Sequence, residues 1–160
     1  MALPSVLLVA PSPSFATAAI PWLADAGFRV TVVGSFEAAK GHITDRLSLL
    51  VSEVRLGDYN GLHLGIRAKA RGVPAIVVGD HDPVLEREAE ALGVRYLRYR
   101  AGRTGLLDAV MSVARSTSAE AVLTDGIASS LSFISLHEIV PPVARPREIF
   151  HRGSRRTLPS

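Results

Sequence analysis

The sequence predicts an α/β fold, a three-layer α/β/α sandwich with a five-stranded parallel sheet between two layers of helices. Two observations support this prediction. Short apolar segments alternate five times with segments of helical spacing over residues 1–117, as in folds built from repeated strand and helix units. Each apolar segment is also nearly continuous, which is typical of strands that are covered on both faces.

The first unit is the apolar segment Ser5–Ala10, which ends in a proline-rich turn. Apolar residues then recur at helical spacing as far as Gly27, and Ser14 is the residue expected to cap this helix. The second unit is the β-branched segment Phe28–Val33, followed by a helix that begins over Ser35–Lys40. Both units therefore have the strand-then-helix order of a parallel sheet.

The other three strands are predicted at Leu47–Ser52, Pro74–Gly79 and Val94–Tyr99, and each precedes a segment of helical spacing. Asp82 and the proline after it form a favourable helix start, because a carboxylate accepts hydrogen bonds from the free amides there. The fifth helix is marked by apolar residues over 106–113. Ligands of parallel sheets bind at the carboxyl ends of the strands, so the residues that follow the strands are the candidates for function.

Residues 118–160 differ in composition from the predicted domain, which covers residues 1–117. We expect a linker at Ser116–Ala119, a candidate extra helix over 119–140 and then a mobile Arg-rich tail. The tail also dominates the charge, because residues 141–160 carry five Arg and one Glu, whereas the whole chain has a net charge of only +3. The basic isoelectric point, near 9.8, is thus a property of the tail.

Composition and motifs exclude several classes of site. The chain has no cysteine, so it has no disulfide, no thiolate zinc site and no cysteine nucleophile. Its longest apolar segments fall far short of the roughly 18 residues that a membrane-spanning helix needs. The sequence contains no Gly-rich phosphate loop and no serine-hydrolase elbow. We therefore expect a cytoplasmic protein that is not an enzyme, uses no cofactor and does not bind a membrane.

The stretch Leu49–Gly61, with the sequence LLVSEVRLGDYNG, resembles a segment of the receiver domains of bacterial two-component response regulators. In that family a phospho-accepting Asp at the end of strand three is followed by Val-Arg-Leu-Pro-Gly-x-Asp-Gly. Val73–Val78 and Ala91–Leu97 are similar to family segments before helix four and around strand five. The resemblance covers about residues 4–116 and implies the flavodoxin-like strand order 2-1-3-4-5.

The positions that carry the family's chemistry differ in this chain. Ala10 and Pro11 stand where receivers have a pair of acids, and Glu53 stands where they have the phospho-accepting Asp. Phosphoryl transfer needs a divalent cation, and Mg²⁺ is held mainly by oxygen ligands such as carboxylates. Glu53 is the only carboxylate that we expect with certainty in the pocket. The resemblance therefore implies a degenerate receiver that is not phosphorylated in the usual way and holds no metal.

Two further pocket positions have also changed. Gly79 replaces the Ser or Thr that ends strand four, and Tyr99 replaces the Lys after strand five. Glu53 then has two interpretations, either a fixed imitation of the phosphorylated state or a solvated or Arg-paired carboxylate at a strand end. The second is favoured, because the Thr and Lys through which the family senses phosphate are absent. Arg98 and Arg100 are the candidate partners of Glu53.

The segment 95–103 holds four Arg and two Tyr and is the candidate interaction face. Tyr96 matches the family's switch aromatic. Tyr and Arg are frequent anchors of protein interfaces, although together they also suit phosphate contacts and base stacking. Protein docking is favoured over nucleic-acid binding. The candidate contact residues are Tyr96, Arg98, Arg100 and Arg103.

Asp80, His81 and Asp82 form a short acidic cluster after strand four, but an Asp at a helix start is common, so capping is favoured over metal binding. The sequence thus predicts an atypical receiver-like signalling module that works by protein–protein interaction, without Asp phosphorylation. We expect a homodimer through helix four, strand five and helix five, and a signalling partner such as a histidine kinase or another regulator. The alternatives are a nucleic-acid-binding protein that uses residues 95–103 and the basic tail, and a receiver phosphorylated in an unconventional way.

Overall fold

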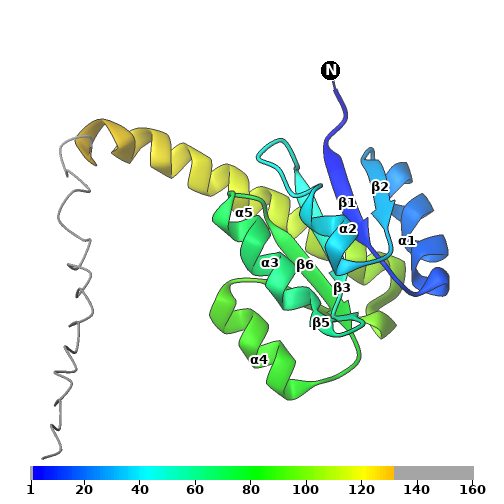
Figure 1. Cartoon of the computed structure of the whole chain (residues 1–160). Coiled ribbons are helices and arrows are strands. Elements are labelled where there is room, and N and C mark those ends of the chain that lie inside the picture. Colours follow the sequence, from blue (N-terminus) through cyan, green and yellow to red (C-terminus); the bar gives the residue numbers. More distant parts are fainter. Residues whose placement is uncertain (1, 132–160) are drawn as a thin grey trace, which may run out of the picture.

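The computed structural model describes the backbone of residues 2–131 and the side chains of residues 2–116. Its centre is a five-stranded sheet with the order β2-β1-β3-β6-β7, in which every neighbouring pair is parallel (Figure 1). Counted along the sheet's own strands, this is the predicted order 2-1-3-4-5. The strands are β1 Ser5–Val9, β2 Arg29–Val33, β3 Leu49–Glu53, β6 Ala75–Gly79 and β7 Arg95–Arg98.

Five helices cover the two faces of the sheet, which confirms the predicted three layers. Successive residues of a strand point to opposite faces. Leu7 therefore packs with α2, α3 and α4, whereas Leu8 packs with α1 and α5. The helices are α1 Pro13–Asp25, α2 Phe36–Lys40, α3 Gly61–Ala70, α4 Pro83–Leu92 and α5 Gly102–Leu131.

The most buried strands lie in the middle of the sheet. All five residues of β3 and all five of β6 are buried, as continuous apolar segments predict. β2 is an edge strand and leaves Val32 exposed. β3 begins at Leu49 rather than at the predicted Leu47, because Leu47 still belongs to a turn in which its amide donates to the carbonyl of Thr44.

A small hairpin that the sequence analysis did not predict lies between β3 and α3. Its strands are β4 Arg55–Leu56 and β5 Tyr59–Asn60, and Gly57 between them has a φ of 66°, a conformation that glycine adopts without strain. The Asn60 side chain then caps α3 by accepting a hydrogen bond of 2.9 Å from the amide of Leu62. The hairpin therefore determines where α3 begins.

The start of α1 also differs from the prediction. Ser12, rather than Ser14, is the N-terminal cap residue, and Pro13 occupies the first turn. Proline suits that position because its φ is already helical and its missing amide hydrogen is not needed there. Ser14 thus lies within the helix. The predicted cap of α4 is confirmed, because Asp82 Oδ1 accepts hydrogen bonds from the amides of Val84 and Leu85, at 3.0 and 3.2 Å.

The linker predicted at Ser116–Ala119 is wrong, because α5 continues through it without a break (Figure 1). The predicted linker contains no glycine or proline, and the Ser116 hydroxyl donates to the carbonyl of Ser112 at 3.1 Å. The first part of the candidate helix 119–140 thus belongs to α5. Residues 132–160, including the predicted Arg-rich tail, lie outside the described residues. Between residues 2 and 131, no helix combines the length and apolar character needed to cross a bilayer.

Candidate functional site

A cavity of about 540 Å³ lies where the carboxyl ends of β1, β3, β6 and β7 meet. This edge is where ligands bind in parallel sheets, and β1 and β3 leave the sheet there toward opposite faces. The predicted positions Glu53 and Tyr99 both line the cavity. Its other lining residues come from α1, β4, the end of β6, β7 and α5, and they include Ser12, Phe15, Trp22, Arg55, Asp80, Leu97, Arg98 and Leu106.

Glu53, the last residue of β3, is only 1% exposed. Its Oε2 accepts a hydrogen bond of 2.9 Å from the amide of Ser12, and its Oε1 accepts one of 2.5 Å from the hydroxyl of Tyr99. A buried carboxylate needs such donors, because burial removes its water shell. The favoured prediction of a solvated or Arg-paired Glu53 is therefore wrong, since both of its recorded donors are uncharged.

Tyr99 reaches Glu53 because β7 ends one residue earlier than predicted. The chain turns at Arg98 into a short 3₁₀ helix, Tyr99–Ala101, and the tyrosine ring lies edge-on against Phe15 with 5.5 Å between the ring centres. Burial, and then the hydrogen bond to Glu53, raise the pKa of the Tyr99 hydroxyl well above its usual range. The position that carries a cationic Lys in receivers thus supplies a neutral donor here.

The acid-pair positions contribute no carboxylate to the cavity. Ala10 is 6% exposed and continues the ladder, with its amide donating to the carbonyl of Val33 at 3.0 Å, and Pro11 is exposed. A second carboxylate does line the cavity, however, because Asp80 directly follows β6. Glu53 was the only carboxylate expected there with certainty, and the exposed side chain of Asp80 adds a second one. Among residues 2–116, whose side chains the structure describes, no three His, Asp or Glu are grouped closely enough to hold a metal ion.

Gly79 and Tyr96 are coupled across β6 and β7. A Cβ atom at Gly79 would collide with the Tyr96 hydroxyl and would lie 2.6 Å from Val54 Cγ1. Because Gly79 has no side chain, the Tyr96 hydroxyl can lie beside it and donate a hydrogen bond of 2.7 Å to the carbonyl of Asp80. Burial raises the pKa of Tyr96, and the nearby charges of Asp82, Glu86 and Asp80 raise it further. Both residues were predicted as site residues, but their contact was not.

Several solved structures with this arrangement of strands and helices are receiver domains. A response regulator receiver domain protein from Methanospirillum hungatei matches over 99% of its chain and 74% of this one, with a TM-score of 0.67 and 18% identity. The chemotaxis response regulator CheY4 of Vibrio cholerae matches over 99% of its chain and 70% of this one, with a TM-score of 0.60 and 21% identity. The signal receiver domain of an HD domain-containing protein from Pseudomonas fluorescens matches over 93% of its chain and 75% of this one, with a TM-score of 0.65 and 20% identity. This chain has the receiver fold.

The likeness to these receiver structures concerns the fold, since the identities lie between 18% and 21%. No protein-family model matches the sequence, and no curated protein matches it. Within the receiver fold, the cavity occupies the edge where the predicted pocket positions were expected to meet. The structure brings four of these positions to that edge, namely Ala10, Glu53, Gly79 and Tyr99.

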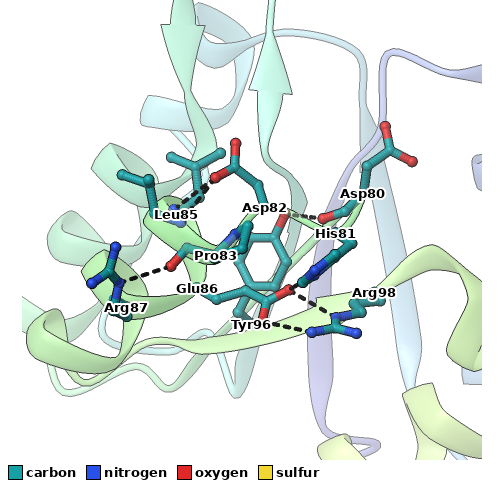
Figure 2. A network of polar contacts seen from close by, with 10 residues as sticks. Asp80, His81, Asp82, Pro83, Leu85, Glu86, Arg87, Tyr96 and Arg98 are labelled. Carbon is teal, nitrogen blue, oxygen red and sulfur yellow. Dashed lines mark hydrogen bonds and ion pairs between the residues drawn. The ribbon is translucent and has the colours of Figure 1, made fainter.

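A polar network beside the cavity ties α4 to β7 in this receiver fold (Figure 2). Arg98 donates through Nε and Nη2 to both carboxylate oxygens of Glu86, at 2.8 and 2.9 Å, and His81 Nδ1 lies 3.0 Å from Glu86 Oε1. The hydrogen bonds from Arg98 and then His81 lower the pKa of Glu86 to about 2. The predicted pairing of Arg98 with Glu53 is wrong, because the guanidinium of Arg98 is already bound through two hydrogen bonds to the carboxylate of Glu86 on α4.

The four predicted contact residues do not share one surface. Arg98 points toward α4, and Tyr96 is half-buried. Arg103 lies on the side of α1, with Nη2 3.8 Å from Asp25 Oδ2, whereas Arg100 is exposed in the 3₁₀ helix. Their roles in docking or in nucleic-acid binding stay predictions, and the basic tail lies outside the described residues.

Proposed function

We propose that this chain is an atypical receiver-like module of two-component signalling that acts by protein–protein contact in the cytoplasm, without phosphorylation of an aspartate. The observation that carries the proposal is Glu53. A 99% buried carboxylate whose two oxygens already accept hydrogen bonds from Ser12 and Tyr99 is poorly placed to attack a phosphoryl group.

The surroundings of Glu53 support the same proposal. Phosphoryl transfer needs a bound cation to neutralise charge on the transferred group. Among the described side chains, Asp80 is the only other carboxylate that lines the cavity, and Ala10 and Pro11 offer none. Mg²⁺ prefers near-octahedral oxygen coordination, which these groups supply poorly.

The proposed contact face consists of α4, β7 and the start of α5. A hollow of about 280 Å³ on this face is lined by Glu90 and Arg95, both exposed, and by the half-buried Tyr96. Acidic and basic side chains on one surface can pair across a two-fold axis, so the face is complementary to a second copy of itself. We propose a homodimer through this face and a signalling partner such as a histidine kinase or another regulator.

The proposal is tested by treating the full chain with acetyl phosphate and Mg²⁺ and measuring its intact mass, with a conventional receiver domain as positive control. We expect no gain of a phosphoryl group. The variant Glu53→Asp should also stay unmodified, because Ala10 and Pro11 still supply no carboxylate. A phosphorylated wild-type chain would overturn the proposal and support the unconventional receiver.

Light scattering after size exclusion tests the contact face on the same samples. We expect a dimer whose mass does not change with acetyl phosphate, and a shift toward monomer in Arg95→Glu, which changes an exposed residue of the proposed face. Arg29→Glu on the edge strand β2 is the matched control and should leave the dimer intact, since Arg29 is exposed on the opposite edge of the sheet. A wild-type monomer at high concentration would contradict the dimer.

A further inference from the structure

We propose that the cavity at the carboxyl edge of the sheet binds a small organic cation, a primary amine joined to an aromatic or aliphatic body. The inference rests on the proposed function in one respect, that Glu53 is not phosphorylated. It adds a ligand site to a module for which the proposed function names only protein partners.

The size and the walls of the cavity suit a small organic molecule. Its volume of about 540 Å³ falls within the range of roughly 300 to 1,000 Å³ that is common for ligand sites. Phe15 and Trp22 from α1 face Leu97 from β7 and Leu106 from α5 around it. Apolar walls of this kind would bury the body of a ligand and leave its polar end at the strand ends.

The polar end of the cavity is anionic. Glu53 is almost fully buried and is held only by uncharged recorded donors, the amide of Ser12 and the hydroxyl of Tyr99. Asp80 adds a second negative charge at the same edge. A buried carboxylate without a cationic partner attracts a positive charge strongly, because little water screens it there.

The two arginines that line the cavity do not cancel this charge. Arg98 is bound through both Nε and Nη2 to Glu86 on α4. Arg55 and Asp80 are both exposed and both screened by solvent, so their opposite charges offset each other and the buried Glu53 carries the remaining negative charge. Glu53 also keeps capacity for a ligand, since each carboxylate oxygen has about two acceptor sites and each uses one here. An ammonium group can supply the further donors.

Trp22 makes the proposal directly measurable, because it is the only tryptophan in the chain and lines the cavity. The probe is phenethylamine, titrated into the full chain while the fluorescence of Trp22 is recorded. Two compounds of similar size serve as comparisons, the neutral 2-phenylethanol and the anionic 3-phenylpropanoate. We expect a saturable change with the amine and binding at least about tenfold weaker for the other two, the effect of a charge-assisted hydrogen bond.

Variants locate the site. Glu53→Gln should weaken amine binding by about tenfold or more, whereas Glu88→Gln, an exposed change on α4 away from the cavity, should leave it unchanged. If Glu53→Gln does not fold, as its circular dichroism would show, Asp80→Asn provides the test, because Asp80 is exposed and lines the cavity. That variant should weaken binding by about threefold.

The outcomes separate this inference from the proposed function. No change of fluorescence with the amine, or equal binding of all three compounds, would overturn the amine site and leave the proposed function standing. Amine binding that is unaffected by Glu53→Gln and Asp80→Asn would also overturn it. A gain of mass with acetyl phosphate would overturn the proposed function whatever the titration shows.

Discussion

Tyr99 and Glu53 show how one hydrogen bond can replace a cation in the pocket of a receiver fold. The Tyr99 hydroxyl is a neutral donor whose pKa is raised, so it keeps its proton over the whole physiological range. Glu53 is thereby held at the end of β3 without an ion pair to any of the described side chains.

Tyr99→Phe should destabilise the protein, because it leaves Glu53 buried with one donor fewer. We expect the free energy of unfolding to fall by about 1 to 3 kcal/mol, measured by urea denaturation. The wild type should also lose stability above about pH 10, because a tyrosine whose pKa is raised on folding keeps a proton that the unfolded chain releases. The variant should lose less over that range. Tyr59→Phe, a change at an exposed tyrosine, is the control, and an equal loss there would contradict the assignment.

Gly79→Ala should be destabilising through Tyr96. The added methyl group would displace the Tyr96 hydroxyl from the carbonyl of Asp80 and press on Val54, which we expect to cost about 1 to 3 kcal/mol of unfolding free energy. In Gly79→Ala/Tyr96→Phe the hydroxyl is absent, so the loss should be smaller than the sum of the two single losses. Additive losses in this double-mutant cycle, measured by urea denaturation, would contradict a direct contact.

The residues of the pocket could be predicted from the sequence, but not all of the contacts between them could. Glu53 and Gly79 could be placed together because parallel strands end at one edge. The bond between Tyr99 and Glu53 depends on β7 ending at Arg98, one residue earlier than predicted, which sets the direction of the next side chain. The contact of Gly79 with Tyr96 had a signal in the sequence, since a glycine at a buried strand end leaves room for a large neighbour.

At the scale of elements, α4 and β7 are joined by Glu86 and Arg98. Arg98 was predicted as a docking residue, but it forms this ion pair instead. The pair positions α4 against the edge of the sheet (Figure 2). Sequence spacing could not reveal it, because the two residues belong to different elements and their approach depends on how α4 packs.

Glu86→Gln should change how stability depends on pH. Folding lowers the pKa of Glu86 from 4.5 to about 2, so its contribution is present above about pH 4.5 and is lost as the pH falls toward 2. The wild type should therefore lose stability over that range, and the variant should lose less, measured by thermal unfolding at several pH values. Glu88→Gln, an exposed neighbour on α4, should behave as the wild type does. Equal acid sensitivity of Glu86→Gln and the wild type would contradict the role of this pair.

Elements without a clear periodic signal were predicted least well. The strands of the hairpin β4 and β5 have two residues each, too few to show an alternating pattern. The segment Ser116–Ala119 was predicted as a linker from its Ser and Thr residues, but hydroxyl side chains are tolerated in a helix when they bond back to the preceding turn, as Ser116 does.

At the scale of the whole molecule, the alternation of strands and helices predicted the three layers, and the family resemblance predicted the strand order. The continuous burial of β3 and β6 explains why their segments were easy to recognise. What the cavity binds could not be predicted, because its walls come from distant parts of the chain. Phe15 and Leu106 meet there only after α1 and α5 pack on the same face of the sheet.

The length and direction of α5 separate the two ends of the molecule. Its 30 residues span roughly 45 Å, whereas a five-residue strand spans roughly 17 Å. The helix begins at Gly102 beside the cavity and runs back past the opposite edge of the sheet (Figure 1). It is therefore a stiff spacer that places its last residue, Leu131, roughly 45 Å from Gly102 beside the cavity, so the two ends of α5 can take part in separate contacts.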